Sequence, residues 1–204
     1  DRIPYLRDML LVDNMLLIAS SEGLMMADYS AQQLIFKTIE HRIDEAFTLD
    51  NGNTKKLLLD DAGVLLLGTV SGLYSLPWES VKRAHRGDGV VKDSKLIIPD
   101  RNIWEMEAQH SNLVWIGSDI GLLQLARKDN AWQASYVLEP STADVALSRS
   151  DVRSVALTSD DNLWIGSYFN GALFWSPSSF NFKTVQNQGN KKPLSDNVIW
   201  SIYE

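Results

Sequence analysis

Leu163-Trp164-Ile165-Gly166 is the clearest copy of a short apolar segment that occurs four times in this sequence. The earlier copies are Leu16-Leu17-Ile18-Ala19, Leu65-Leu66-Leu67-Gly68 and Val114-Trp115-Ile116-Gly117. The copies end at residues 19, 68, 117 and 166, so each step is 49 residues. Self-similarity at a fixed period of this size indicates a repeat architecture.

Each period contains four short segments with strand character. In the last full period they are residues 152–157, 163–167, 172–176 and 180–185. The Ser-Asp-Asp-Asn stretch at 159–162 favours a tight turn, and Gly171 would ease a positive φ at the next reversal. Four strands in roughly 40–50 residues, repeated, are typical of a β-propeller blade, so the predicted fold class is all-β. Residues 31–47 also fit an amphipathic helix, but the repeat register favours an outer strand over 34–39.

A blade of this kind is apolar on both faces and buries them only by stacking on its neighbours. Trp115 and Trp164 share one register position and are predicted to fill the space between adjacent sheets. Paired glycines are predicted to allow tight turns and close approach between blades. These glycines are Gly68 and Gly72, Gly117 and Gly121, and Gly166 and Gly171.

The number of repeats predicts an incomplete array. The four full repeats are residues 5–53, 54–102, 103–151 and 152–198, and residues 199–204 have the pattern of the first strand of a fifth. A closed four-bladed ring has no place for this surplus innermost strand. We therefore expect four four-stranded blades plus one strand, as a fragment of a propeller with seven or more blades. The alternative is a four-bladed ring whose last strand is free or exchanged with a partner.

The composition excludes several function classes. The 204 residues carry a net charge of −7, which argues against nucleic-acid or anionic-membrane binding, because both require a concentrated basic face. The sequence contains no cysteine, so it cannot form disulfides or thiolate metal sites. No apolar run approaches the roughly 20 residues of a membrane span, and the N-terminus is not a signal peptide. Any export or anchoring segment is expected outside this sequence.

The repeat resembles a known family. Residues 161–167, Gly171-Ala172-Leu173-Phe174 and residues 194–204 resemble the two-component regulator propeller repeat. Residues 112–118 match it well, whereas the first two repeats depart from it, with leucine in place of the usual tryptophan. The resemblance covers nearly the whole chain and is strongest in its C-terminal half.

This resemblance implies the periplasmic sensor region of a membrane-anchored bacterial signalling protein. The output module would be a hybrid histidine kinase or a GGDEF diguanylate cyclase outside this chain. The resemblance implies no catalysis and no cofactor here, and an unidentified small-molecule signal, for which carbohydrate is typical. Signal transmission by rearrangement or by homodimerisation is expected, with membrane attachment only through segments outside the chain.

Two sets of residues are candidates for ligand binding. Strand alternation puts one basic or aromatic residue of each innermost strand on the same face as Leu57, Met106, Val155 and Ile202. This first set is Lys55, Trp104, Arg153 and Trp200. Tryptophan and arginine at a channel mouth suit sugar stacking or anion recognition. The competing interpretation is that the tryptophans are core and Arg153 satisfies loop carbonyls.

The second set lies in loops at the usual binding face of propellers. It comprises Arg101, Asp119, Tyr168, Phe169 and Asn170. Two adjacent aromatic residues on a turn either pack locally or bind something, because their exposure is costly.

Other polar residues carry weaker signals. The three histidines lack ligand spacing, so no metal site is predicted. The basic run at 82–86 is predicted to be a solvated loop. Glu105 and Glu107 could imitate a glycosidase pair, but no spacing supports this. A protein–protein scaffold and a glycan-active propeller enzyme remain alternative functions; the Gly-His and Trp-Asp pairs expected of WD-repeat scaffolds are missing.

Overall fold

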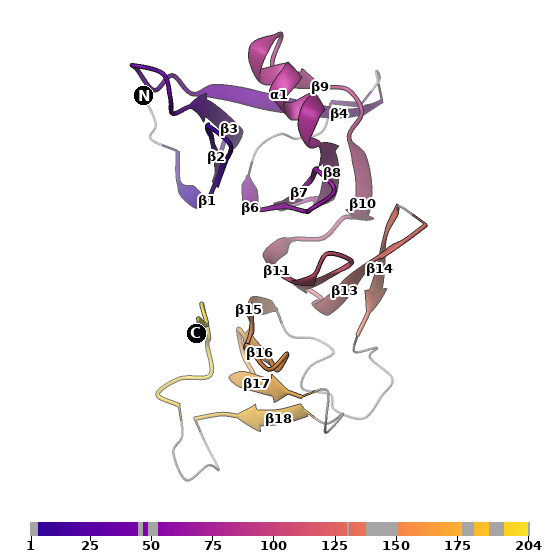
Figure 1. Ribbon diagram of the computed structural model, residues 1–204. Helices are drawn as coiled ribbons and strands as arrows, with labels where there is room; N and C mark the ends of the chain where they lie inside the picture. The colour runs from indigo at the N-terminus through magenta and orange to yellow at the C-terminus, as the bar shows by residue number, and fades with distance from the viewer. Residues whose placement is uncertain are drawn as a thin grey trace. The chain divides into compact units, whose positions relative to one another are not determined.

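The computed structural model describes residues 4–44, 47–48, 53–129, 131–137, 151–176, 182–187 and 194–203. Its strands form four sheets, each ordered as an antiparallel meander, with one additional short parallel strand at the edge of the first (Figure 1). This arrangement confirms the predicted all-β fold of propeller blades. The chain divides into two compact units, residues 1–103 and 104–204.

The first unit contains two blades. The first blade consists of β1 (Leu6–Val12), β2 (Met15–Ser20), β3 (Gly23–Asp28) and β4 (Lys37–Asp44), with the short β5 (Phe47–Thr48) beyond β4. The second blade consists of β6 (Thr54–Leu59), β7 (Val64–Thr69), β8 (Gly72–Pro77) and β10 (Lys95–Pro99). The strand interpretation of residues 31–47 is confirmed, although β4 begins later than predicted, after the exposed Leu34 and Ile35.

An insertion between β8 and β10 was not predicted. It contains the helix α1 (Trp78–Arg86) and the short strand β9 (Val90–Val91). The prediction of a solvated loop at 82–86 is wrong, because α1 buries Trp78, Val81 and Ala84 along one face. β9 pairs in parallel with β4, and the Lys37 ammonium donates to carbonyl oxygens at the C-terminal end of α1. The insertion of the second blade thus covers the outer edge of the first.

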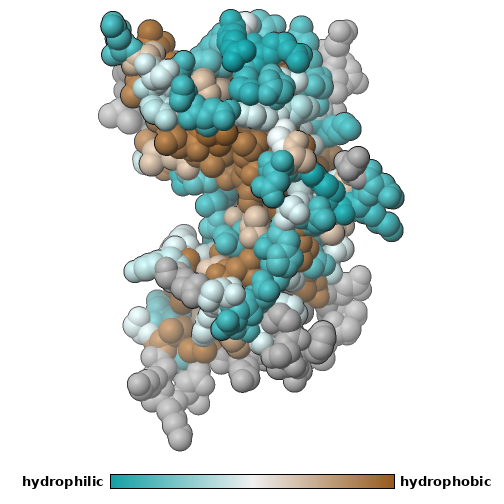
Figure 2. Space-filling model, in the orientation of Figure 1, coloured by the Kyte–Doolittle hydropathy of each residue, from teal (hydrophilic) through white to brown (hydrophobic). Residues whose placement is uncertain are grey.

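The outward side of β1 is apolar. Leu6, Met9 and Leu11 are each 59–65% exposed, whereas Leu10 and Val12 pack against the core of the first unit. Apolar residues therefore gather on the surface of this unit, as the brown areas in Figure 2 show. Such a face is what a blade presents when no neighbour is stacked on it.

The second unit contains two further blades. The third blade consists of β11 (Ile103–His110), β12 (Leu113–Ser118), β13 (Gly121–Lys128) and β14 (Ala131–Tyr136). The fourth consists of β15 (Val152–Leu157), β16 (Leu163–Ser167), β17 (Ala172–Trp175) and β18 (Phe182–Val185). Trp115 is 4% exposed and contacts Trp175 of the next blade at 5.8 Å, which confirms its predicted place between sheets. Trp164 is half-buried and lies against Phe174 of its own blade.

Glycines in the second strand of a blade allow the next innermost strand to approach. A Cβ atom on Gly117 would lie 2.7 Å from the carbonyl oxygen of Val152, where β15 begins. A Cβ atom on Gly166 would lie 2.5 Å from Cγ2 of Ile199, whose N–H donates to the Ser167 carbonyl at 2.9 Å. Ile199 thus takes the place predicted for the start of a fifth innermost strand. Residues 199–203 form no regular strand, which departs from the strand predicted for residues 199–204.

A buried hydroxyl closes the turn between the second and third strands of every blade. The four hydroxyl groups donate to the carbonyl oxygen of the glycine at the start of the third strand or, in the fourth blade, directly before it, at 2.9–3.0 Å. They belong to Ser20, Thr69, Ser118 and Ser167, again in steps of 49 residues. The hydroxyl satisfies a buried backbone acceptor that would otherwise lack a partner.

Candidate functional site

Arg153 lies on a β-bulge at the start of β15. The pairing of β15 with β16 shifts register between Val152 and Ser154, so Arg153 is the extra residue. A bulge interrupts side-chain alternation and re-aims the side chain, which corrects the simple alternation assumed from the sequence. β6 has the same bulge at Lys55, between Thr54 and Lys56.

Three aromatic rings surround the Arg153 guanidinium. Its Cζ atom lies 3.6 Å from the ring centroid of Trp104, 4.8 Å from that of Tyr168 and 5.6 Å from that of Trp200. Trp104 belongs to β11, Tyr168 to the β16–β17 turn and Trp200 to the segment 194–203. Three consecutive repeats therefore each contribute one ring to a single cation, in the range of favourable cation–π interaction.

A carboxylate balances the charge of this cation. Arg153 Nη2 donates to Asp151 Oδ2 at 2.6 Å, and the two side chains are only 15% and 23% exposed. Within the described part of the chain, Arg153 Nε has no hydrogen-bond acceptor. The guanidinium is therefore held by one carboxylate and by ring faces, and the cluster carries little net charge.

The outer part of the cluster is an exposed aromatic surface. Tyr168 contacts Phe169 and Trp200 edge to face, at centroid distances of 4.6 and 5.4 Å. Phe169 is 66% exposed and Trp200 is 65% exposed. Two large rings left in water beside a charge-balanced arginine are suited to stacking against a flat, mainly uncharged ligand.

Backbone hydrogen bonds hold the β16–β17 turn in place. The Tyr168 N–H donates to the Asp151 carbonyl at 2.9 Å, and the Asn170 N–H donates to Ser167 Oγ at 2.8 Å. Gly171 adopts a φ of 73°, and its N–H donates to the Asn197 carbonyl at 2.9 Å. The turn is thus fixed both to the innermost strand and to the segment that carries Trp200.

The structure brings together five of the nine predicted binding residues: Trp104, Arg153, Tyr168, Phe169 and Trp200. Asn170 shapes the turn beside them. Asp119 is exposed in the β12–β13 turn of the same unit. Lys55 and Arg101 belong to the first unit, where Lys55 is buried and Arg101 donates to the Asp100 carbonyl. Sequence reasoning missed Asp151 as the partner of Arg153, although the i, i+2 acid–base pair was visible.

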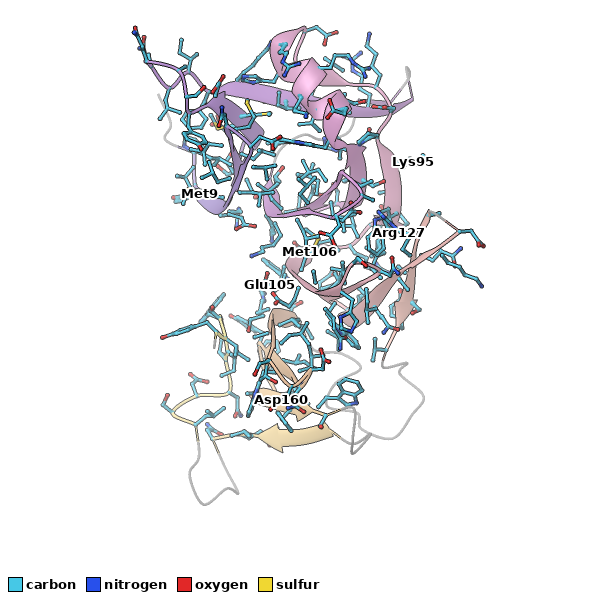
Figure 3. All side chains as sticks on the ribbon, viewed as in Figure 1. Met9, Lys95, Glu105, Met106, Arg127 and Asp160 are labelled. Atoms are coloured by element: carbon cyan, nitrogen blue, oxygen red, sulfur yellow. The ribbon has the colours of Figure 1, made fainter. Side chains whose placement is uncertain are left out.

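The described residues hold no group of three or more histidine, aspartate or glutamate side chains that could bind a metal ion. Glu105 lies on β11 beside Met106 (Figure 3).

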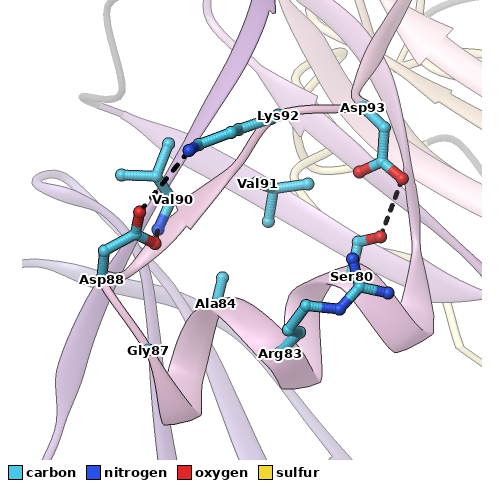
Figure 4. Close-up of a pocket in the computed structure, with 9 residues that line it drawn as sticks. All are labelled: Ser80, Arg83, Ala84, Gly87, Asp88, Val90, Val91, Lys92 and Asp93. Atoms are coloured by element: carbon cyan, nitrogen blue, oxygen red, sulfur yellow. Dashed lines mark hydrogen bonds and ion pairs between the residues drawn. The ribbon is translucent and has the colours of Figure 1, made fainter.

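The first unit has an open pocket of about 600 Å³ between α1 and β9 (Figure 4). In that pocket Ser80 donates to Asp93 at 2.8 Å, and Lys92 lies 3.9 Å from Asp88.

One segment of the chain matches a known protein family. Residues 146–169 match the family "Two component regulator propeller". This segment is similar to a two-component regulator propeller repeat. The matched residues include Arg153, the second-strand motif of the fourth blade and the Tyr168-Phe169 pair. The resemblance inferred from the repeated motifs is thereby confirmed.

Solved structures share the fold at low sequence identity. The extracellular domain of a hybrid two component system predicted for B. thetaiotaomicron superimposes with a TM-score of 0.69 at 16% identity, covering 97% of this chain and 24% of that one. A second such domain from B. thetaiotaomicron gives 0.54 at 16% identity, covering 100% and 32%. PorZ, a surface component of the type-IX secretion system of Porphyromonas gingivalis, gives 0.69 at 13% identity, covering 97% and 29%. This chain thus spans about a quarter to a third of these proteins.

No curated protein matches this sequence. Among the described residues, no helix has the length and apolar character needed to cross a membrane.

Proposed function

We propose that this chain is part of an extracytoplasmic, ligand-sensing propeller of a bacterial signalling protein and has no catalytic activity of its own. The regulator-propeller match at residues 146–169 and the fold shared with extracellular domains of hybrid two-component systems support this proposal. Those relatives favour a hybrid histidine kinase as the output module over a GGDEF diguanylate cyclase.

The Arg153 cluster is the observation that carries the proposal. Its exposed rings, Phe169 and Trp200, can stack on the C–H face of a sugar ring, while the Arg153–Asp151 pair offers donors and acceptors to hydroxyl groups. Because Asp151 balances the arginine, we infer a neutral saccharide rather than an anionic one. The rings come from successive repeats, so a ligand would fasten these repeats together and favour one arrangement of the propeller.

Binding can be tested with a panel of neutral oligosaccharides, followed by thermal shift and tryptophan fluorescence. For a saccharide that binds, Trp200→Ala should weaken binding at least about tenfold, because it removes the exposed stacking surface. The melting temperature without ligand should change little, since Trp200 is 65% exposed. Tyr203→Ala is the matched control, because Tyr203 lies on the same segment, is 90% exposed and is not part of the cluster. Equal binding by both variants would refute this site.

A further inference from the structure

The outermost strand of a blade exposes unpaired backbone groups, and natural proteins protect such edges. In the first blade, β9 and β5 pair with β4. In the second, β10 carries Lys95 and Pro99, and in the fourth, β18 has only four residues and includes Lys183. The third blade ends differently. Its outer strand β14 has six residues, Ala-Trp-Gln-Ala-Ser-Tyr, with no charge and no proline.

The register shows which backbone groups of β14 face outward. β13 and β14 pair from Lys128↔Ala131 to Leu123↔Tyr136, and the Val137 N–H donates to the Leu122 carbonyl. Residues of an antiparallel strand bond alternately to one side and the other. Val137, Ser135 and Gln133 therefore bond to β13, whereas the N–H and C=O groups of Ala134 and Tyr136 point away from the sheet.

We propose that β14 is a strand-addition surface that pairs with β14 of a second copy of this chain, antiparallel across a two-fold axis. In the register centred on Ala134, that residue faces its own copy and Trp132 faces the partner's Tyr136. Ala134 is exposed and Tyr136 is 49% exposed, and the Trp132 ring is already held by Arg127, whose Cζ lies 4.6 Å from the ring centroid (Figure 3 labels Arg127). Cross-strand aromatic pairs stabilise antiparallel strands.

A second copy fits this edge better than an unrelated strand. The two-fold register places Trp132 opposite the partner's Tyr136 on both sides of the axis, and it opposes no like charges because β14 carries none. Because one such edge per chain is used on both sides of the axis, the assembly closes as a dimer and does not extend into fibres. Pairing one strand of six residues buries little surface, so the dimer belongs to the weak class with interfaces below about 1,200 Å².

The proposal predicts a monomer–dimer equilibrium of the 204-residue chain in sedimentation velocity at increasing micromolar concentrations. Ala134→Pro removes the central outward N–H from both copies and leaves every bond between β13 and β14 intact. It should raise the dimer dissociation constant at least about tenfold. Ala134→Val, which keeps the N–H and favours strands, is the matched control and should dimerise as well as the native chain. Unchanged near-ultraviolet circular dichroism would show that both variants fold.

Hydrogen exchange of the native chain locates the interface without any variant. The amides of Ala134 and Tyr136 should become protected as the concentration rises, while those of Gln133 and Ser135 stay protected throughout. A chain that remains monomeric at all concentrations overturns the proposal. A dimer that persists in Ala134→Pro, or protection by another protein at the Ala134 amide without self-association, also overturns it. These outcomes are independent of saccharide binding, which involves different residues.

Discussion

Lys55 and Arg153 occupy the same place in the repeat, but their surroundings differ. Each is the bulged residue of an innermost strand. Lys55 is 6% exposed, and its own strand β6 is hydrogen-bonded to the preceding blade, where Asp8 accepts from the Leu57 N–H at 2.9 Å. Arg153 is instead surrounded by three rings beside an exposed aromatic surface. The 49-residue period thus repeats the backbone position, while the neighbouring side chains decide whether the residue there is packed in the interior or lies beside an exposed aromatic surface.

The two units are expected to differ most in their stability at acidic pH. Burial lowers the pKa of His41, in the first unit, to about 4, and the imidazole ring lies 4.7 Å from that of Tyr74. A histidine whose folded pKa is below its unfolded value of about 6.5 keeps its full contribution to stability above pH 6.5 and loses it as the pH falls towards 4. The first unit should therefore lose up to about 3 kcal/mol over this range.

Hydrogen exchange resolved by segment, measured between pH 7 and pH 4, checks this prediction. Strands β3, β4 and β8 should lose protection before β12 and β16 of the second unit. In His41→Phe, which removes the titrating group, the loss should be smaller by about 1.4 kcal/mol per pH unit. Burial also lowers the pKa of His85, so some acid sensitivity of the first unit should remain in this variant. An unchanged pH dependence would contradict the role of His41.

The next largest effect on stability is expected in the second unit. Arg153→Ala removes the cation from among three rings and leaves Asp151, whose side chain is 23% exposed, without its partner. The second unit should lose about 2 kcal/mol of stability and all saccharide binding. Arg153→Lys is the control, because it keeps the charge and loses the planar stacking. Urea unfolding with segment-resolved exchange measures both variants. An equal loss of stability in the first unit would contradict this prediction.

Much of the fold follows from the period alone, because backbone sterics repeat with it. Gly117 and Gly166 allow a neighbouring strand to approach, and their spacing predicts this without knowledge of the surroundings. The helix α1 could not be predicted in the same way. Its buried face consists of Trp78, Val81 and Ala84 among basic residues, and part of what it contacts is β4, which is distant in sequence.

The aromatic and basic residues of the candidate site could be predicted from the sequence, whereas the carboxylate that balances Arg153 was missed. Arg153 and Trp200 stand out at one strand position, and Tyr168 and Phe169 stand out on a turn, but only the folded chain brings the two sets together. Asp151 has the appearance of an ordinary turn residue, since carboxylates commonly satisfy loop backbones. Its position two residues before Arg153 was the one sequence signal for their contact.

The smallest effect on stability is expected for a side-chain hydrogen bond that occurs in both units. Ser20 in the first unit and Ser118 in the second each donate a buried hydroxyl to the glycine carbonyl of the following turn, at 2.9 Å. Replacing either serine with alanine leaves that carbonyl without its partner and should cost about 1 kcal/mol in its own unit. Ser20→Thr and Ser118→Thr are the matched controls, because Thr69 performs the same role in the second blade. Differential scanning calorimetry with segment-resolved exchange measures the losses. Equal values would place the difference between the units in the side chains around Lys55 and Arg153 rather than in the blade framework; a large loss in one unit alone would mean that the framework itself differs.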